Sequence, residues 1–254
     1  MSALLLKLAA PLQSWGASSR YTTRETRTEP TKSGVLGMLA SAQGWNRDYD
    51  ITDLLQLKFG VRIEQKGQLV RDYQTARPTQ FQEENRKKGE LPDMPLTYRY
   101  YVSDACYLVV LVSQARSILE TIEGALNHPK WPLFLGRRSC PPAGQLVLGI
   151  RDSYDTVEDV LTKEPWHASS WYKKRSYYEN SYKYEDLEIV YDSEDRALYT
   201  QSDVPVSFDI RHRRYALRSI GRRFIPNPDN KNISGDLSQV LNTVHFDHDP
   251  MDFS

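Results

Sequence analysis

The chain has 254 residues, of which 39% are hydrophobic, and its 33 basic side chains balance 33 acidic ones. A mean hydropathy of -0.61, no apolar run near the ~20 residues of a membrane helix, and no signal-peptide pattern at the start predict a cytoplasmic protein without a membrane segment. The neutral total argues against indiscriminate nucleic-acid binding, and two widely separated cysteines, Cys106 and Cys140, fit a reducing compartment.

The N-terminal part of the chain alternates between apolar and basic stretches. Leu4 to Leu8 is a short apolar run that predicts a buried strand, and Trp15 after it is expected to pack in the core. A basic loop from Arg20 then leads to apolar residues at helical spacing, which predict a helix that begins near Ser33. The lysine of this stretch precedes its glycines, which argues against the nucleotide-binding loop of ATPases.

Two interpretations of this loop and helix remain open. Unpaired N–H groups at a helix N-terminus bind anions, and neighbouring arginines favour phosphate, so the stretch predicts a contact with a phosphate backbone. Alternatively, Gly34 and Gly37 allow the helix to pack closely on a sheet, and the arginines form an ordinary solvated loop.

The following residues, up to 151, predict an α+β domain. Strands are expected at 59–65 and 68–75, joined as a hairpin by Lys66 and Gly67, and again at 98–102, 105–113 and 145–150, with a helical turn at 52–57 and a helix at 115–127. Residues 76–96 lack periodicity and predict a protruding insertion. The order strand, helix, strand, strand, helix, strand is that of the ferredoxin-like (RRM-like) fold, in which helices cover one face of an antiparallel sheet and leave the other free.

The remainder predicts a smaller β-rich region at 152–226 and an acidic, loosely attached tail at 227–254. Aromatic and basic residues between Trp166 and Tyr184 suit either RNA stacking or an irregular small sheet. Residues 204–210 predict an edge strand carrying Pro205. Residues 211–223 hold six arginines and no carboxylate, which predicts a basic face on a subunit that binds nucleic acid on one side and protein on others.

No motif for catalysis stands out. The sequence contains no G-x-S-x-G, no H-E-x-x-H and no Cys/His nucleophile arrangement. H-F-D-H-D at 245–249 resembles a metal-ligand cluster, but the tail offers no fixed second shell, so we expect no metal and no cofactor. Metal-independent ribonuclease chemistry by Tyr, Lys and His stays conceivable, although no convincing set is marked.

Several motifs occur in an order that resembles the CasD family of type I-E CRISPR Cascade subunits, which are RAMP proteins. They are P-L-Q-S-W-G at 11–16, P-T-K-S-G-V-L-G-M-L-A-S-A-x-G at 30–44, R-D-Y-Q-T at 71–75, Y-V-S-D-A-C-Y at 101–107 and F-L-G-R-R-S-C-P-P at 134–142. The likeness covers about the first 150 residues. It implies a non-catalytic subunit that binds the 5′ handle of CRISPR RNA and contacts the Cascade backbone subunit and the large PAM-reading subunit.

The resemblance also implies a thumb hairpin at about 74–101 and a set of RNA contacts. The implied contacts are Arg24, Arg27, Lys32, Ser33, Gly34, Tyr73, Tyr98, Arg99, Tyr101, Arg137 and Arg138. Related RAMP proteins are endoribonucleases that process repeat RNA; the absence of an adjacent Lys-His pair counts against that alternative. A purely protein-bridging subunit is the third expectation.

Overall fold

The computed structural model describes residues 1–16, 22–76, 96–152, 154–193, 199–208 and 214–232. Its elements, in chain order, are β1 (Ser2–Ala9), β2 (Leu12–Gln13), β3 (Thr23–Arg24), α1 (Lys32–Gln43), α2 (Thr52–Leu55), β4 (Lys58–Gln65), β5 (Gln68–Gln74), β6 (Thr97–Ser103), β7 (Cys106–Ser113), α4 (Arg116–Asn127), β8 (Val147–Arg151), α5 (Val157–Lys163), α6 (Ser170–Glu179), β9 (Leu187–Asp192), β10 (Tyr199–Ser207), β11 (Arg214–Ile225) and the 3-10 helix η1 (Pro228–Asn232).

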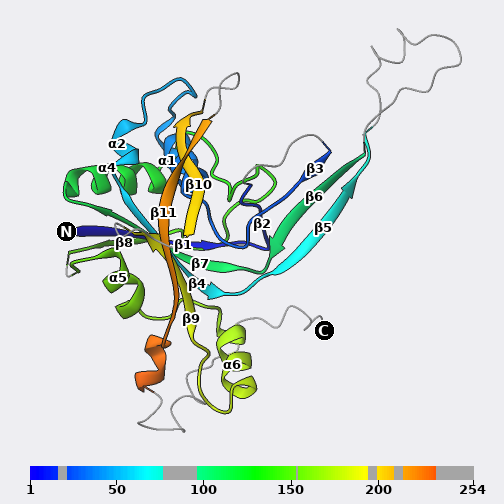
Figure 1. The fold of residues 1–254 in the computed structure, drawn as a ribbon, viewed down its shortest axis with the longest axis vertical. Helices are drawn as coiled ribbons and strands as arrows, with labels where there is room; N and C mark the ends of the chain where they lie inside the picture. The colour runs from blue at the N-terminus through cyan, green and yellow to red at the C-terminus, as the bar shows by residue number, and fades with distance from the viewer. Residues whose placement is uncertain (17–21, 77–95, 153, 194–198, 209–213, 233–254) are drawn as a thin grey trace, which may run out of the picture.

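A seven-stranded sheet forms the centre of the molecule, in the order β10-β11-β9-β4-β7-β1-β8 (Figure 1). Each of its pairings is antiparallel. β1 and β7 run side by side from Ser2 opposite Ser113 to Ala9 opposite Cys106. The fold is therefore α+β, and the predicted strands that became β1, β4, β7 and the edge strand β10 are confirmed, as are helices α1 and α4.

Strands β9, β10 and β11 extend this same sheet beyond β4. β9 pairs with β4, Val61 opposite Val190, and β11 pairs with β9 along six residues. The region 152–226 thus has no sheet of its own among the described residues. The division expected at residue 151 does not coincide with a boundary of the sheet.

Both faces of the sheet are covered, so the prediction of one free face is wrong. Leu4, Leu6 and Leu8 pack on the side of α1 and α4, whereas Leu5 and its neighbours pack on the other side against α5. In Figure 1, α1, α2 and α4 lie on one side of the sheet and α5 on the other. The physical reason is in the strands themselves: β1 and β7 are apolar at consecutive positions, as strands buried on both faces are.

A second, smaller sheet is built around β6. β5 pairs with β6 along its whole length and not with β4, so the predicted hairpin of 59–65 with 68–75 is wrong. A Cβ on Gly67 would lie 2.4 Å from the carbonyl oxygen of Ser103. The backbones approach closely at this glycine, and there the chain leaves the large sheet. β2 and β3 also pair with β6, β3 in parallel.

The start of the expected loose tail is anchored. Asn227 is buried, and the Asp229 carboxylate accepts a hydrogen bond from the Trp166 N–H (3.2 Å) and pairs with the Lys173 ammonium (2.9 Å). The prediction is therefore wrong for residues 227–232. The rest of the tail lies outside the described residues, and so do residues 77–95 of the insertion predicted at 76–96.

Candidate nucleic-acid interface

Strands β5 and β6, named the thumb hairpin from here on, lean out from the central sheet with β3 beside β6 (Figure 1). Paired residues share a face of a sheet and successive residues alternate between faces. Arg24 pairs with Arg99, and Tyr73 pairs with Tyr98. The predicted contact residues therefore separate, with Arg24, Arg99 and Tyr101 on one face and Tyr73 and Tyr98 on the other.

Arg137 joins the first of these faces from the loop after α4. Its guanidinium lies 5.0 Å from the ring centroid of Tyr101, and its Nη2 donates to the carbonyl oxygen of Arg24 (3.0 Å). Tyr101 is only 4% exposed. Its ring thus supports Arg137 through a cation–π contact and is not open to a base, which corrects the expected role of this residue.

Three arginines of this region carry a buried guanidinium nitrogen that no described residue pairs. The atoms are Nε of Arg27, Nε of Arg99 and Nη1 of Arg137. We name Arg24, Arg27, Arg99 and Arg137 the arginine cluster; within the described part of the chain none of the four forms an ion pair. Buried donors without partners are costly and rare, so we take these three arginines as candidate ligand-binding residues.

Backbone contacts between distant segments hold the cluster together. Gly136 has φ +85°, and a Cβ there would lie 1.8 Å from the carbonyl oxygen of Ser14. The Ser14 N–H in turn donates to the Leu135 carbonyl oxygen (3.2 Å), and the Arg27 N–H donates to the Trp15 carbonyl oxygen (2.8 Å). Only glycine allows this approach, which places Arg137 beside Arg24.

A polar cavity of about 270 Å³ opens beside the arginine cluster. Its lining includes Arg24 and Arg137, together with Ser33 and Gly34 from the first turn of α1. Tyr215 of β11 lines it as well, a residue that the sequence did not single out. No local pattern marks Tyr215, because only the sheet order brings β11 to this place. The cavity therefore unites four of the predicted contact residues.

The first turn of α1 is largely satisfied from within the protein. The Lys32 N–H donates to Oδ2 of Asp203 (2.8 Å), and the Lys32 ammonium pairs with Asp192 (2.8 Å). Thr31 caps the helix and accepts the Gly34 N–H (3.2 Å). The prediction of Lys32 as a phosphate contact is therefore wrong: its side chain is a buried structural cation.

Gly34 has a packing role in addition to its place in the cavity lining. A Cβ there would lie 2.9 Å from the ring of Trp15, which is buried as predicted. Trp15 thus lies directly under the helix N-terminus. The packing interpretation of this glycine is correct, and the hydroxyl-bearing residues Thr31 and Ser33 of the helix start line the same polar cavity.

The opposite face of the thumb hairpin is aromatic. The rings of Tyr73 and Tyr98 lie 5.4 Å apart, and the Arg71 guanidinium lies 5.6 Å from the Tyr98 ring centroid. Tyr73 is 52% exposed. Such a ring beside a cation is a suitable platform for stacking of a base.

Three arginines of the expected basic face at 211–223 are ion-paired within the protein, whereas residues 211–213 lie outside the described ranges. Arg218 pairs with Asp192 and Asp203 (2.6 Å each), Arg222 pairs with Glu29 (2.6 Å), and Arg223 pairs with Glu158. These carboxylates come from β9, β10, helix α5 and the loop before α1. The basic segment is separate from acidic residues in the sequence, but the fold brings carboxylates beside Arg218, Arg222 and Arg223.

The aromatic residues between 166 and 184 gather around helix α6 and the loop after it, not in a small sheet. Trp166 and Tyr177 are buried, whereas Trp171, Tyr178 and Tyr182 are about half exposed or more. The expected stacking of RNA on this cluster stays a prediction.

Within the described ranges, no group of three His, Cys, Asp or Glu is arranged to hold a metal ion, and no helix is long and apolar enough to cross a membrane. The H-F-D-H-D stretch at 245–249 lies outside those ranges. Burial raises the pKa of the Cys106 thiol to about 12, which makes this side chain an unreactive part of the core.

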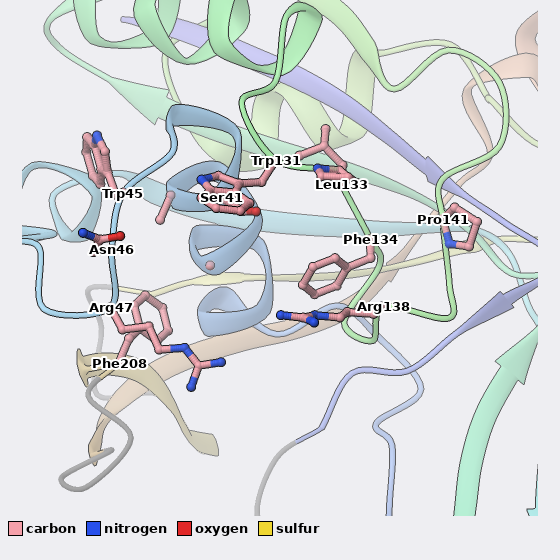
Figure 2. Close-up of a pocket in the computed structure, with 13 residues that line it drawn as sticks. Ser41, Trp45, Asn46, Arg47, Trp131, Leu133, Phe134, Arg138, Pro141 and Phe208 are labelled. Atoms are coloured by element: carbon pink, nitrogen blue, oxygen red, sulfur yellow. The ribbon is translucent and has the colours of Figure 1, made fainter.

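Arg138 points away from the arginine cluster, although it neighbours Arg137 in sequence. It lines a separate, larger cavity next to helix α1 (Figure 2). The predicted basic lip of two arginines is thus divided between two cavities. The residues that enclose the larger one, among them Trp45 and Trp131, were not predicted as site residues.

Comparisons with known proteins match this arrangement to one class of protein. A family model described as CRISPR-associated protein (Cas_Cas5) matches residues 3–221. The CRISPR system Cascade subunit CasD of Escherichia coli K12 is 33% identical over 178 residues, which cover 65% of this chain and 78% of that protein. The resemblance to the CasD family is confirmed by these matches.

Two solved structures share the fold. A crystal structure of a Cas protein matches with a TM-score of 0.65 and 31% identity, covering 89% of this chain and 95% of that one. A chain of a CRISPR RNA-guided surveillance complex matches with a TM-score of 0.69 and 30% identity, covering 94% and 99%. The α+β fold and these matches together define the chain as a CRISPR-associated protein. The chain belongs to the Cas5 family.

Proposed function

We propose that the chain is a non-catalytic RNA-binding subunit of a CRISPR Cascade surveillance complex, and that it holds the 5′ handle of CRISPR RNA. The observation that carries the proposal is the arginine cluster with its three unpaired, buried guanidinium nitrogens. Membership of the Cas5 family and the likeness to a chain of an RNA-guided complex support it.

Phosphate is the ligand that best fits the arginine cluster. Guanidinium groups present planar pairs of N–H donors that match phosphate oxygens, and they stay charged at every physiological pH. Arg24 and Arg137 line the same polar cavity, and Ser33 adds a hydroxyl. A single-stranded backbone running past Arg24, Arg99 and Arg137 would meet one guanidinium group after another, so we place Arg24, Arg27, Arg99, Arg137 and Ser33 on the backbone.

The thumb hairpin supplies the second part of the proposed RNA-binding site. RNA in single strands is bound through stacked bases as well as through phosphates. Tyr73 and Tyr98 offer this stacking on the face opposite the arginines. The hairpin would therefore pass between two stretches of the handle, or between the handle and the adjoining subunit.

The strand order supports a ferredoxin-like core for this function. Within the large sheet, β4, β7, β1 and β8 are neighbours in that order, and α1 and α4 connect them on one face. With its other face covered by α5, this core differs from an RNA-recognition module that binds RNA on its sheet. The proposed RNA contacts accordingly lie on the thumb side, and we assign other surfaces to the backbone subunit and the large subunit, in the cytoplasm.

Replacement of Arg27, Arg99 and Arg137 by alanine should weaken binding of a single-stranded repeat RNA and flatten its salt dependence. Each lost phosphate contact changes the slope of log K against log salt by about 0.7, so three should change it by about 2. The measurement is a binding titration of the full chain between about 50 and 200 mM salt, the range over which counterion release is resolved.

A matched control removes the same charge elsewhere. Arg116, Arg151 and Lys163 are exposed and lie on α4, β8 and α5. Their replacement by alanine should leave the salt slope close to that of the unmodified chain. The proposal would be contradicted if both triple variants lost equal affinity for the RNA. It would also be contradicted if the salt slope of the Arg27, Arg99 and Arg137 variant were unchanged.

A further inference from the structure

A cavity of about 630 Å³ lies between the second half of helix α1 and the loop at 131–141 (Figure 2). Figure 2 shows Arg138 extending from that loop toward α1, with Phe134 beside it and Arg47 approaching from the opposite side. The walls are mainly aromatic and apolar; they comprise Trp45, Trp131, Pro132, Leu133, Phe134, Pro141 and Phe208.

A small set of polar side chains completes the lining. Ser41, Asn46, Arg47 and Arg138 contribute a hydroxyl, an amide and two guanidinium groups, and the described lining contains no carboxylate. Apolar walls with a few convergent polar groups are typical of a site for a small planar ligand. The two guanidinium groups favour an occupant that carries hydrogen-bond acceptors.

This cavity is separate from the polar one beside the arginine cluster, but both lie along helix α1. Ser33 and Gly34 of α1 line the polar cavity, and Gly37, Ala40 and Ser41 of the same helix line the apolar one. At about 1.5 Å of rise per residue, members of the two groups lie roughly 4 to 12 Å apart along the helix. On the facing loop, Arg137 belongs to the first cavity and Arg138 to the second.

We infer that the apolar cavity receives one nucleobase of single-stranded RNA, turned out of the strand while the adjoining phosphate lies at the arginine cluster. Splayed bases are bound in RNA complexes by aromatic stacking and by hydrogen bonds to the base edge, which Trp131 or Phe134 and Asn46 would provide. The inference rests on the proposed function. Its own evidence is the second cavity, the two arginines without a carboxylate, and the position of both cavities along α1.

The test is an abasic scan of a single-stranded repeat RNA, bound to the full chain and to a variant with the cavity filled. Gly37→Leu places a side chain in the lining; a Cβ there meets only the Phe208 ring, at 3.7 Å, an ordinary contact. Gly124→Leu on α4 is the matched control, because nothing lies within 4 Å of its Cβ. Trp131→Ala, at a side chain 57% exposed, is a second variant that leaves the core intact.

The unmodified chain should lose affinity about tenfold, the order of one stacked base, at a single abasic position. Gly37→Leu and Trp131→Ala should bind intact RNA with a similar loss and become insensitive to that position, while Gly124→Leu behaves like the unmodified chain. A scan without any sensitive position, with the salt slope of the arginine cluster intact, would overturn the inference and leave the proposed function standing.

Two further outcomes are equally decisive. If Gly37→Leu binds RNA normally but no longer assembles with its partner subunits, the cavity holds an apolar protein side chain and the inference is wrong. If replacing the arginine cluster leaves RNA binding unchanged, the proposed function itself fails. The salt slope and the abasic scan thus report on the two proposals separately.

Discussion

Replacing Arg62 by leucine is expected to destabilise the protein by about 4 kcal/mol, within the range for breaking a buried ion pair. Arg62 is 0% exposed; its Nε pairs with Oε1 of Glu64 (2.5 Å), and its Nη groups donate to three carbonyl oxygens between Leu161 and Pro165 (2.6–2.7 Å). Without the guanidinium, the buried Glu64 carboxylate would lose its cationic partner and keep the His167 N–H as a donor, and the three carbonyls would lose the guanidinium donors. Denaturant unfolding followed by tryptophan fluorescence measures the loss.

The neighbouring surface supplies the control for Arg62→Leu. Lys163 pairs with Asp159 at the end of α5, and its side chain is 58% exposed. Lys163→Leu should change the free energy of unfolding by less than about 0.5 kcal/mol. A double variant with Glu64→Leu should cost less than the sum of the single variants, because both remove the same pair. Additive losses would show that Arg62 acts without Glu64.

The local elements were predictable because their signals lie within short segments. Apolar runs gave β1 and β7, helical spacing gave α1 and α4, and Pro205 marked β10 as an edge strand. The burial of both sheet faces was also present in the sequence, as the consecutive apolar residues of β1. The covering helix α5 is difficult to predict from the sequence, because it has only seven residues and begins in a segment of weak periodicity.

Pairing between distant segments could not be predicted. The sequence of the turn at Gly67 does not indicate that β5 pairs with β6. The close approach of Gly67 to Ser103 exists only in the folded chain. Likewise, the arginines of β11 predict a basic face from the sequence, whereas the fold places Asp192 and Asp203 beside Arg218.

The candidate site was predicted in composition but not in arrangement. Arg24, Arg99 and Arg137 come together because β3 pairs with β6 and Gly136 docks its loop on Ser14. The prediction of Lys32 as a phosphate contact was wrong because Asp192, the carboxylate that pairs with it, lies 160 residues away in the sequence. A basic residue at a helix start indicates an anion, but the sequence does not distinguish phosphate from an internal carboxylate.

Asp203→Ala is the second substitution expected to have a large effect, about 3 to 5 kcal/mol of lost stability. Asp203 is 1% exposed and accepts hydrogen bonds from Nε of Arg218 (2.6 Å) and from the Lys32 N–H (2.8 Å). Burial by itself would lower the pKa of the Arg218 guanidinium, but hydrogen bonds from it to Asp203 and the charges of Asp203 and Asp192 raise it. The cation therefore stays buried in the variant with one of its two carboxylates removed.

The same substitution connects stability to the proposed RNA site. Asp203 holds the first N–H of α1, one residue before Ser33 of the polar cavity. Asp203→Asn keeps an acceptor and should lose less stability than Asp203→Ala, whereas Asp159→Ala at an exposed pair should lose about 0.5 kcal/mol or less. Unfolding in denaturant gives the order of the three variants. If Asp203→Ala and Asp159→Ala lost equal stability, Asp203 would not hold β10 and β11 to the start of α1.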